Sequence, residues 1–139
     1  MRTETEDQVR SILAGMPCER SSLLPALWAV VDQMGWIDDD RMEAVAAVLN
    51  LPVADVYGVA SFYAMLPTDG RTRVRVCDDV LCHLAGSQSL MEAVRQTGLD
   101  AVAWPCLGRC EQAPAALVNE KPVVRATADT IQRVARGGE

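Results

Sequence analysis

The sequence predicts an α+β protein in which a helical N-terminal segment precedes a smaller domain of mixed strands and helices. Apolar residues recur at helical spacing through most of the first half. Pro67–Gly70 then forms a break that is typical of a linker. From Thr72 to Val76 polar and apolar residues alternate, as they do in a β-strand. We therefore expect a helical domain at residues 1–69 and a second domain at residues 70–139.

Two helices are expected in the first part of the helical domain. The first spans Glu4–Leu13 and ends near Gly15. The second begins at Ser22, whose side chain can cap it, and it tolerates Pro25 in its first turn and stops at Gly35. Its apolar face is formed by Leu23, Leu24, Leu27, Trp28 and Val31.

Two further helices complete the predicted helical domain. Asp38–Asp40 begin the third, because negative charge suits a helix N-terminus. Leu51-Pro52 begins the fourth. The apolar side of the third helix is formed by Met42, Val45, Ala46 and Leu49. The apolar side of the fourth is formed by Val53, Val56, Tyr57 and Ala60, followed by Tyr63 or Ala64.

The second domain is predicted to have the order β-α-β-β-α, which suits a small α/β sandwich. Thr127 is expected to cap the last helix, which Gly137 and Gly138 close. The expected elements before it are a strand at Thr72–Val76, a helix at Leu84–Gln96, a strand at Ala101–Trp104 and a hairpin of Ala115–Val118 with Val123–Val124.

Four of the five cysteines form two pairs in the second domain. Cys77 and Cys82 are separated by four residues, Cys106 and Cys110 by three, and 23 residues lie between the pairs. Thiolates are soft ligands, and four of them in one reduced domain indicate a metal or an iron–sulfur cluster. Cys18 stands apart and is expected to be a free thiol.

The spacing favours an all-cysteine [2Fe–2S] cluster over the other metal centres. Structural zinc sites usually contain C-x2-C knuckles, which are absent here, so zinc stays open but is not favoured. A Rieske centre needs two histidines, and the chain has only His83. No run of closely spaced cysteines for a [4Fe–4S] cluster and no C-x-x-C redox pair occurs. Unligated thiols are the remaining alternative.

Several segments, in the same order, resemble one protein family. The segments in the second domain are Val76-Cys77, Cys82–Gly86, Pro105–Cys110 and Gln112–Asn119. Those in the helical domain are Ser22–Leu27 and Val56–Tyr63. They resemble the peripheral [2Fe–2S] component, or E subunit, of NADH-quinone oxidoreductases, a family related to the gamma subunit of NAD-dependent formate dehydrogenase and to parts of NAD-linked hydrogenases.

The resemblance implies a thioredoxin-like [2Fe–2S] ferredoxin fold for residues 70–139. It implies that Cys77, Cys82, Cys106 and Cys110 bind the cluster, and that a partner subunit carries a flavin and binds NAD(H). A hydride carries two electrons and one cluster moves a single electron, yet the chain has no nucleotide-binding fingerprint and no recognisable flavin site. We therefore expect a non-catalytic electron-transfer subunit, docked through residues 1–69. The alternatives are a zinc-stabilised structural or interaction module and a free-standing [2Fe–2S] ferredoxin.

Charge and hydropathy indicate which kinds of partner suit the chain. The net charge of −6 divides into −7 for residues 1–69, with 4 basic and 11 acidic residues, and +1 for residues 70–139, with 9 basic and 8 acidic residues. This distribution does not suit nucleic acid, which requires a basic face. No apolar run is long enough to span a membrane, and the acidic N-terminus differs from a signal peptide. We therefore expect a cytoplasmic protein without direct membrane insertion.

The residues around the four cysteines have expected roles as well. Asp78 and Asp79 are expected to face water, and His83 to form a hydrogen bond or lie at the surface. Arg109, between two cysteines, is expected to oppose the acidic charge or to contact a partner. Gly108 is expected to let its backbone approach the cluster closely, because it has no Cβ.

Overall fold

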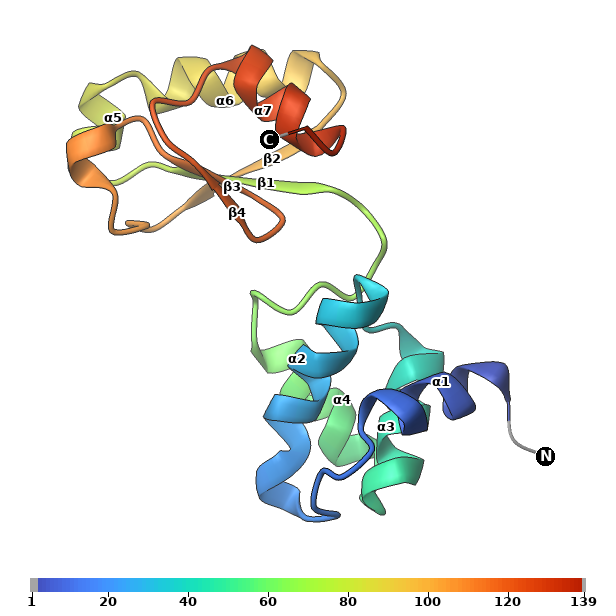
Figure 1. Cartoon of the computed structure of the whole chain (residues 1–139). Helices are drawn as coiled ribbons and strands as arrows, with labels where there is room; N and C mark the ends of the chain where they lie inside the picture. The colour runs from blue at the N-terminus through green and yellow to red at the C-terminus, as the bar shows by residue number, and fades with distance from the viewer. Residues whose placement is uncertain (1–2, 139) are drawn as a thin grey trace. The chain divides into compact units, whose positions relative to one another are not determined.

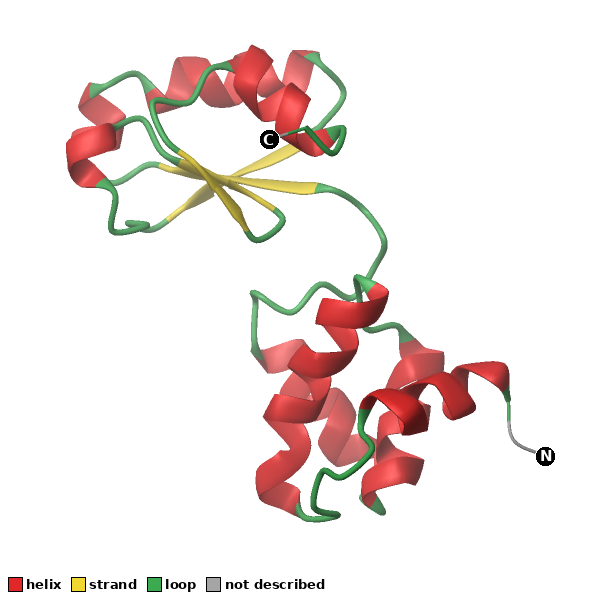
Figure 2. Cartoon of the chain, in the orientation of Figure 1, coloured by secondary structure: helices red, strands yellow, loops and turns green. Residues whose placement is uncertain are grey.

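The computed structural model describes residues 3–138, and the chain divides between Gly70 and Arg71 into two compact units. The first unit contains helices only, and the second contains a four-stranded sheet with helices (Figures 1 and 2). The predicted α+β class is therefore confirmed. No helix of the described residues is long and apolar enough to cross a membrane.

The helical unit contains four α-helices close to the predicted positions. They are α1 (Glu4–Ile12), α2 (Leu23–Met34), α3 (Asp39–Leu49) and α4 (Val53–Phe62), with a 3-10 helix at Arg20–Ser22 before α2. The side chains of Thr3 and Asp38 cap α1 and α3 by accepting hydrogen bonds from backbone N–H groups. The core joins all four helices, and its largest fully buried residues are Val9, Leu27, Val30, Ile37, Val45, Leu49 and Val56.

Ser22 does not cap α2 as expected. It is the last residue of the 3-10 helix, already has helical backbone angles, and makes no capping hydrogen bond with its side chain. A capping residue needs an extended backbone to turn its oxygen toward the first free N–H groups, so the 3-10 turn precludes this role. The predicted end of α2 is correct, because Gly35 terminates it with a φ of +91°.

The apolar stripe of α4 is only partly buried. Val56 and Ala60 lie in the core, whereas Val53 and Tyr57 are 47% and 57% exposed. Only part of the predicted apolar side of α4 therefore lies in the core. The stripe is wider than the surface that the other helices cover, so its edge remains accessible.

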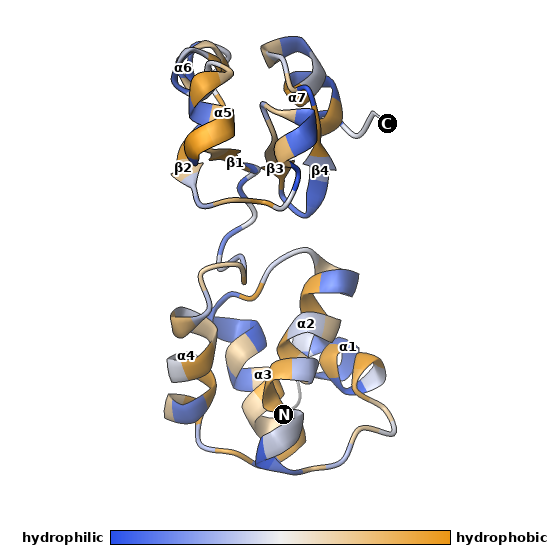
Figure 3. Ribbon diagram, turned by 90° about the vertical axis from the view of Figure 1, so that its left-hand side faces the viewer, coloured by the Kyte–Doolittle hydropathy of each residue, from blue (hydrophilic) through white to orange (hydrophobic). Residues whose placement is uncertain are grey.

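The second unit is a mixed sheet with helices packed on one face. Strand β1 (Arg73–Cys77) pairs in parallel with β2 (Asp100–Trp104) and antiparallel with β3 (Ala116–Val118), which pairs antiparallel with β4 (Lys121–Val123). The helices are α5 (Val80–Leu84), α6 (Ser87–Gln96) and α7 (Ala128–Ala135), and a 3-10 helix spans Cys110–Gln112. Figures 1 and 3 show α6 and α7 on the same side of the sheet. A separate core lies beneath them, with Val74, Val76, Val94 and Ile131 fully buried.

The helix predicted at Leu84–Gln96 begins later than expected. Leu84 is the last residue of α5, and α6 begins at Ser87. Gly86 stands between them with a φ of +92°, a conformation that a residue with a Cβ rarely adopts. The break lets α5 run in a different direction from α6, and Cys82 lies in α5.

Candidate functional site

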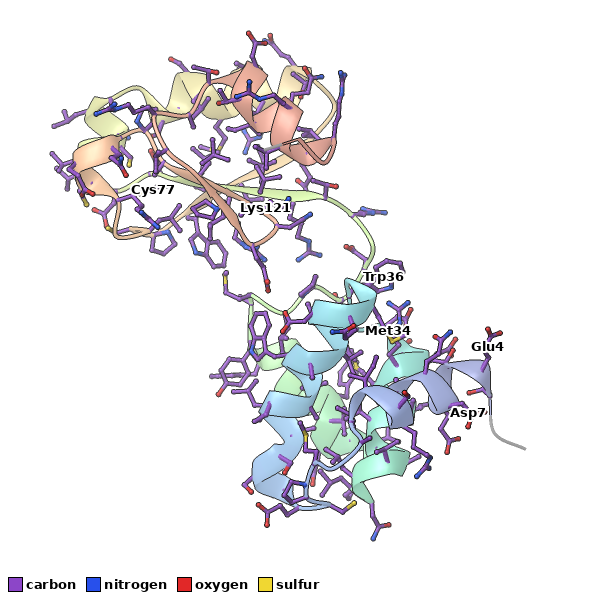
Figure 4. All side chains as sticks on the ribbon, in the orientation of Figure 1. Glu4, Asp7, Met34, Trp36, Cys77 and Lys121 are labelled. Atoms are coloured by element: carbon purple, nitrogen blue, oxygen red, sulfur yellow. The ribbon has the colours of Figure 1, made fainter. Side chains whose placement is uncertain are left out.

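The four paired cysteines lie at one end of the sheet. Cys77 is the last residue of β1 and pairs in register with Trp104, the last residue of β2 (Figure 4). Cys82 follows Cys77 within α5, and Cys106 follows Trp104 in the loop that leads to Cys110. Since parallel strands end on the same edge, both cysteine loops leave the sheet together, as the sequence predicted.

Their thiols are free and form two pairs. The sulfur atoms of Cys106 and Cys110 lie 3.5 Å apart, and Cys77 lies close enough to Cys82 to raise the pKa of its thiol. Cys77 and Cys82 are 2% and 3% exposed, whereas Cys106 and Cys110 are exposed. The site thus has a buried pair and an accessible pair.

The two pairs also influence each other electrostatically. Burial is the main cause that raises the pKa of Cys82, and repulsion by Cys77 and Cys106 raises it further. The pKa of Cys110 is raised, first by its hydrogen bond with Cys106 and then by the charge of the other cysteines. Four thiolates would repel one another here, so a compensating positive charge is needed to deprotonate all four. Iron ions supply such charge, and binding them releases the protons.

The four thiols consist of two pairs. Within residues 3–138, no group of three or more cysteine, histidine or acidic side chains is placed to hold a metal ion. An all-cysteine [2Fe–2S] cluster has four thiolate ligands, two for each iron, and the pairs Cys77/Cys82 and Cys106/Cys110 correspond to that arrangement.

Gly108 supplies a backbone donor at the exposed pair. Its N–H group donates to the sulfur of Cys106 at 3.3 Å. A Cβ on Gly108 would meet no protein atom within 4 Å, and the close approach of its backbone to the cluster stays a prediction. Glycine also suits the φ of +71° at this position, with which the N–H donates to the sulfur. Hydrogen bonds to ligating sulfurs are among the features that set the potential of iron–sulfur clusters.

The two aspartates of the first cysteine loop have different roles. Asp79 is exposed and caps α5, accepting a hydrogen bond of 2.8 Å from the backbone N–H of Val80. Asp78 turns its carboxylate toward Ser87 and His83 instead of facing water freely. His83 forms the hydrogen bond expected of it, and Arg109 is exposed beside Cys110. Sequence reasoning missed Ser87, because the predicted helix runs through it without a break.

Cys18 lies in the other unit. Its thiol is exposed, is not part of a disulfide and donates to the backbone oxygen of Val48 at 3.4 Å. The free thiol of Cys18 agrees with the expectation.

The fold and this site correspond to one class of protein. The sequence model of the thioredoxin-like [2Fe-2S] ferredoxin family matches residues 9–138, and the chain belongs to that family. The predicted fold, family and [2Fe–2S] cofactor are thereby confirmed.

Named relatives agree with the predicted resemblance. The E subunit of the NADH-quinone oxidoreductase of Escherichia coli K12 is 33% identical, and the match covers 81% of this chain and 76% of that protein. NADH-quinone oxidoreductase subunit 2 of Thermus thermophilus is also 33% identical, with 87% and 76% covered. Among solved structures, an NAD+-reducing [NiFe]-hydrogenase in the H2-reduced state matches with a TM-score of 0.64 and 26% identity. That match covers 83% of this chain but only 22% of the hydrogenase chain, so the similarity is to one part of a longer protein.

Proposed function

We propose that this chain is the [2Fe–2S] electron-transfer subunit of an NAD(H)-linked oxidoreductase complex. The observation that carries the proposal is the convergence of two cysteine pairs at one end of a thioredoxin-like sheet. The relatives named above are subunits of NADH-quinone oxidoreductases. In this proposal the chain relays electrons and performs no chemistry on NAD(H) itself.

Cys77, Cys82, Cys106 and Cys110 are the proposed ligands. When bound, a [2Fe–2S] cluster accepts and donates single electrons. The protein supplies a buried pair that limits solvent on one side and an exposed pair toward which a redox partner can approach. The backbone N–H of Gly108 offsets negative charge on Cys106. The proposed compartment is the cytoplasm, where thiols stay reduced.

The proposed redox partner is a subunit that binds flavin and NAD(H). A flavin can take two electrons from a hydride and release them singly, which the cluster cannot do. The sequence contains no nucleotide-binding fingerprint that would place this step on the chain itself. The proposed division of labour therefore needs a stable docking surface.

We place this docking surface on the helical unit, at the exposed aromatic residues around the end of α4. Phe62, the only phenylalanine of the chain, is 78% exposed. It packs edge-on against Tyr63, with ring centroids 5.2 Å apart, and Tyr57 is also exposed. Aromatic residues are enriched at the centres of protein interfaces, where their burial contributes much of the binding free energy.

The second exposed apolar surface lies beside the cysteines. Val80, Leu81 and Leu84 of α5 are exposed, and Figure 3 shows α5 as strongly hydrophobic. An electron-transfer partner must come close to the cluster, so this surface is suited to the contact across which electrons pass. We assign anchoring to the aromatic surface, because its side chains are larger and more rigid.

Analysis of iron and sulfide in anaerobically purified protein tests the proposed function. We expect iron and acid-labile sulfide in equal amounts, about two of each per chain. Reduction with dithionite should produce the electron paramagnetic resonance signal of a reduced [2Fe–2S] cluster. Stoichiometric zinc without sulfide would instead support the alternative of a zinc-stabilised module.

Co-purification with the flavin-bearing subunit tests the docking surface. The double variant Tyr57→Ser/Phe62→Ser should retain its cluster but lose stable association. The matched variant Leu81→Ser/Leu84→Ser should co-purify with the flavin-bearing subunit at a yield closer to that of the wild type. It should transfer electrons more slowly than the wild type. Loss of association in the second variant alone would move the anchor to α5. Absence of any association in the wild-type protein would support a free-standing ferredoxin.

A further inference from the structure

The residue after the first proposed ligand is the centre of a hydrogen-bond network. The Asp78 backbone N–H donates to the carbonyl oxygen of Trp104 at 3.0 Å. The Asp78 carboxylate accepts from the hydroxyl of Ser87 at 2.5 Å and lies 2.9 Å from Nδ1 of His83. One residue thus contacts three separate elements of the second unit.

Each of these elements is connected to a cysteine. Trp104 ends β2 and is two residues before Cys106. His83 directly follows Cys82 in α5, and Asp78 itself follows Cys77. Movement of Asp78 would therefore be transmitted to both members of the buried pair and to the loop that carries the exposed pair.

Ser87 fixes the carboxylate to the body of the domain. It is the first residue of α6, is 0% exposed, and faces the Asp78 carboxylate with its hydroxyl. A buried hydroxyl requires a hydrogen-bond partner, and this hydrogen bond is charge-assisted.

α5 has little else to hold it in place. It contains five residues, of which only Cys82 is buried, and its outer side chains Val80, Leu81 and Leu84 are exposed. So short a helix is not stable by itself and needs tertiary contacts. The hydrogen bonds that Asp78 makes with His83 and that Asp79 accepts from the Val80 N–H are therefore important for its position.

We propose that Asp78 is a positioning residue for the [2Fe–2S] site, which fixes the Cys77/Cys82 pair by joining α5 to the N-terminus of α6 and to the end of β2. The inference rests on the proposed ligand set. Asp78 does not touch the cluster in this proposal; it acts through Ser87, His83 and Trp104. Outer hydrogen-bond partners of this kind determine how tightly ligands hold a metal.

Chelator challenge of the cluster-loaded full-length protein tests this role. Asp78→Ala should release iron about tenfold faster than the wild type, as for other residues that orient metal ligands. Ser87→Ala should change the release rate in the same direction. Asp78→Asn keeps an oxygen that can accept from Ser87, so it should restore much of the retention. Asp100→Asn is the matched control, because Asp100 is exposed at the opposite end of β2.

Spectroscopy distinguishes a positioning role from a general loss of stability. Asp78→Ala and Ser87→Ala should alter the g-values of the reduced cluster, whereas the control should not. If Asp78→Ala does not fold, as judged by circular dichroism, Ser87→Ala alone gives the same test. Wild-type release rates and g-values in both Ser87→Ala and Asp78→Ala, or in Ser87→Ala alone if Asp78→Ala does not fold, would overturn the inference. Absence of a [2Fe–2S] cluster in the wild type would instead overturn the proposed function.

Discussion

The backbone N–H of Gly108 lies 3.3 Å from the sulfur of Cys106 and donates a hydrogen bond to it. The contact depends on the left-handed conformation of Gly108, which has a φ of +71°. A residue with a side chain adopts this conformation at a cost of about 1–2 kcal/mol. The relationship between the two residues thus depends on the backbone conformation of Gly108, since no other protein atom restricts a Cβ there.

Replacing Gly108 with alanine should destabilise the second unit and weaken cluster retention. We expect the free energy of unfolding of the cluster-free protein to fall by about 1 kcal/mol in urea. Gly58→Ala is the control, because Gly58 lies within α4 with open space around its Cα. That variant should be more stable by about 0.5–1 kcal/mol, since alanine is favoured over glycine inside helices. Equal stability of the two variants would contradict this account of Gly108.

Serine at each proposed ligand should reduce cluster content, whereas serine at Cys18 should not. The hydroxyl of serine is a poorer ligand for iron than a thiolate, and each of the four cysteines belongs to one of the two pairs. Iron and acid-labile sulfide in the purified variants provide the measurement. A full complement of cluster in Cys106→Ser would show that the ligand set is different.

Much of this fold could be predicted from the sequence, because its signals are local. The helices of the first unit follow apolar periodicity, and α1 and α3 also have acidic first turns. The strand before Cys77 follows the alternation of polar and apolar residues. The convergence of the two cysteine loops follows from the parallel pairing of β1 with β2. Family resemblance then added the cofactor, which spacing alone left open between iron–sulfur and zinc.

The features that were missed depend on contacts between distant residues. Alternation places Arg75 on the polar side of a strand, yet it is buried, with its guanidinium 5.0 Å from the centre of the Trp104 ring. The partnership of Asp78 with Ser87 required knowledge that Gly86 divides the predicted helix. The exposure of Tyr57 depended on how much of α4 the other helices cover. The periodicity of apolar residues does not reveal which distant residues come into contact.

Truncation of a core leucine should affect stability far more than truncation of an exposed one. Leu27 is fully buried between the helices of the first unit, whereas Leu84 is 78% exposed on α5. We expect Leu27→Ala to lower the free energy of unfolding by about 2–5 kcal/mol, because it leaves a cavity. Leu84→Ala should change it by less than about 0.5 kcal/mol. Urea titrations followed by circular dichroism compare the two variants directly.

The purified chain should not oxidise NADH, although dithionite should reduce its cluster. The reason is the absence of a recognisable flavin site and nucleotide-binding fingerprint in the sequence. The assay is NADH-dependent reduction of ferricyanide by flavin-free protein, with the reconstituted flavoprotein complex as positive control. Robust activity of the isolated chain would contradict the proposed division of labour.

Deleting residues 1–69 should separate cluster binding from docking. The core of the helical unit ends at Leu66, and the core of the second unit begins at Val74, so the two share no buried residue. All four proposed ligands lie beyond residue 76, and we therefore expect the fragment to bind its cluster. The fragment lacks the aromatic surface of Tyr57, Phe62 and Tyr63, so it should not co-purify with the flavin-bearing subunit.

The full-length Tyr57→Ser/Phe62→Ser variant is the matched comparison for this deletion and should also fail to co-purify. Association of the fragment at wild-type yield would place the interface on the cluster unit, and loss of its cluster would show that the cluster unit depends on the helical unit for stability.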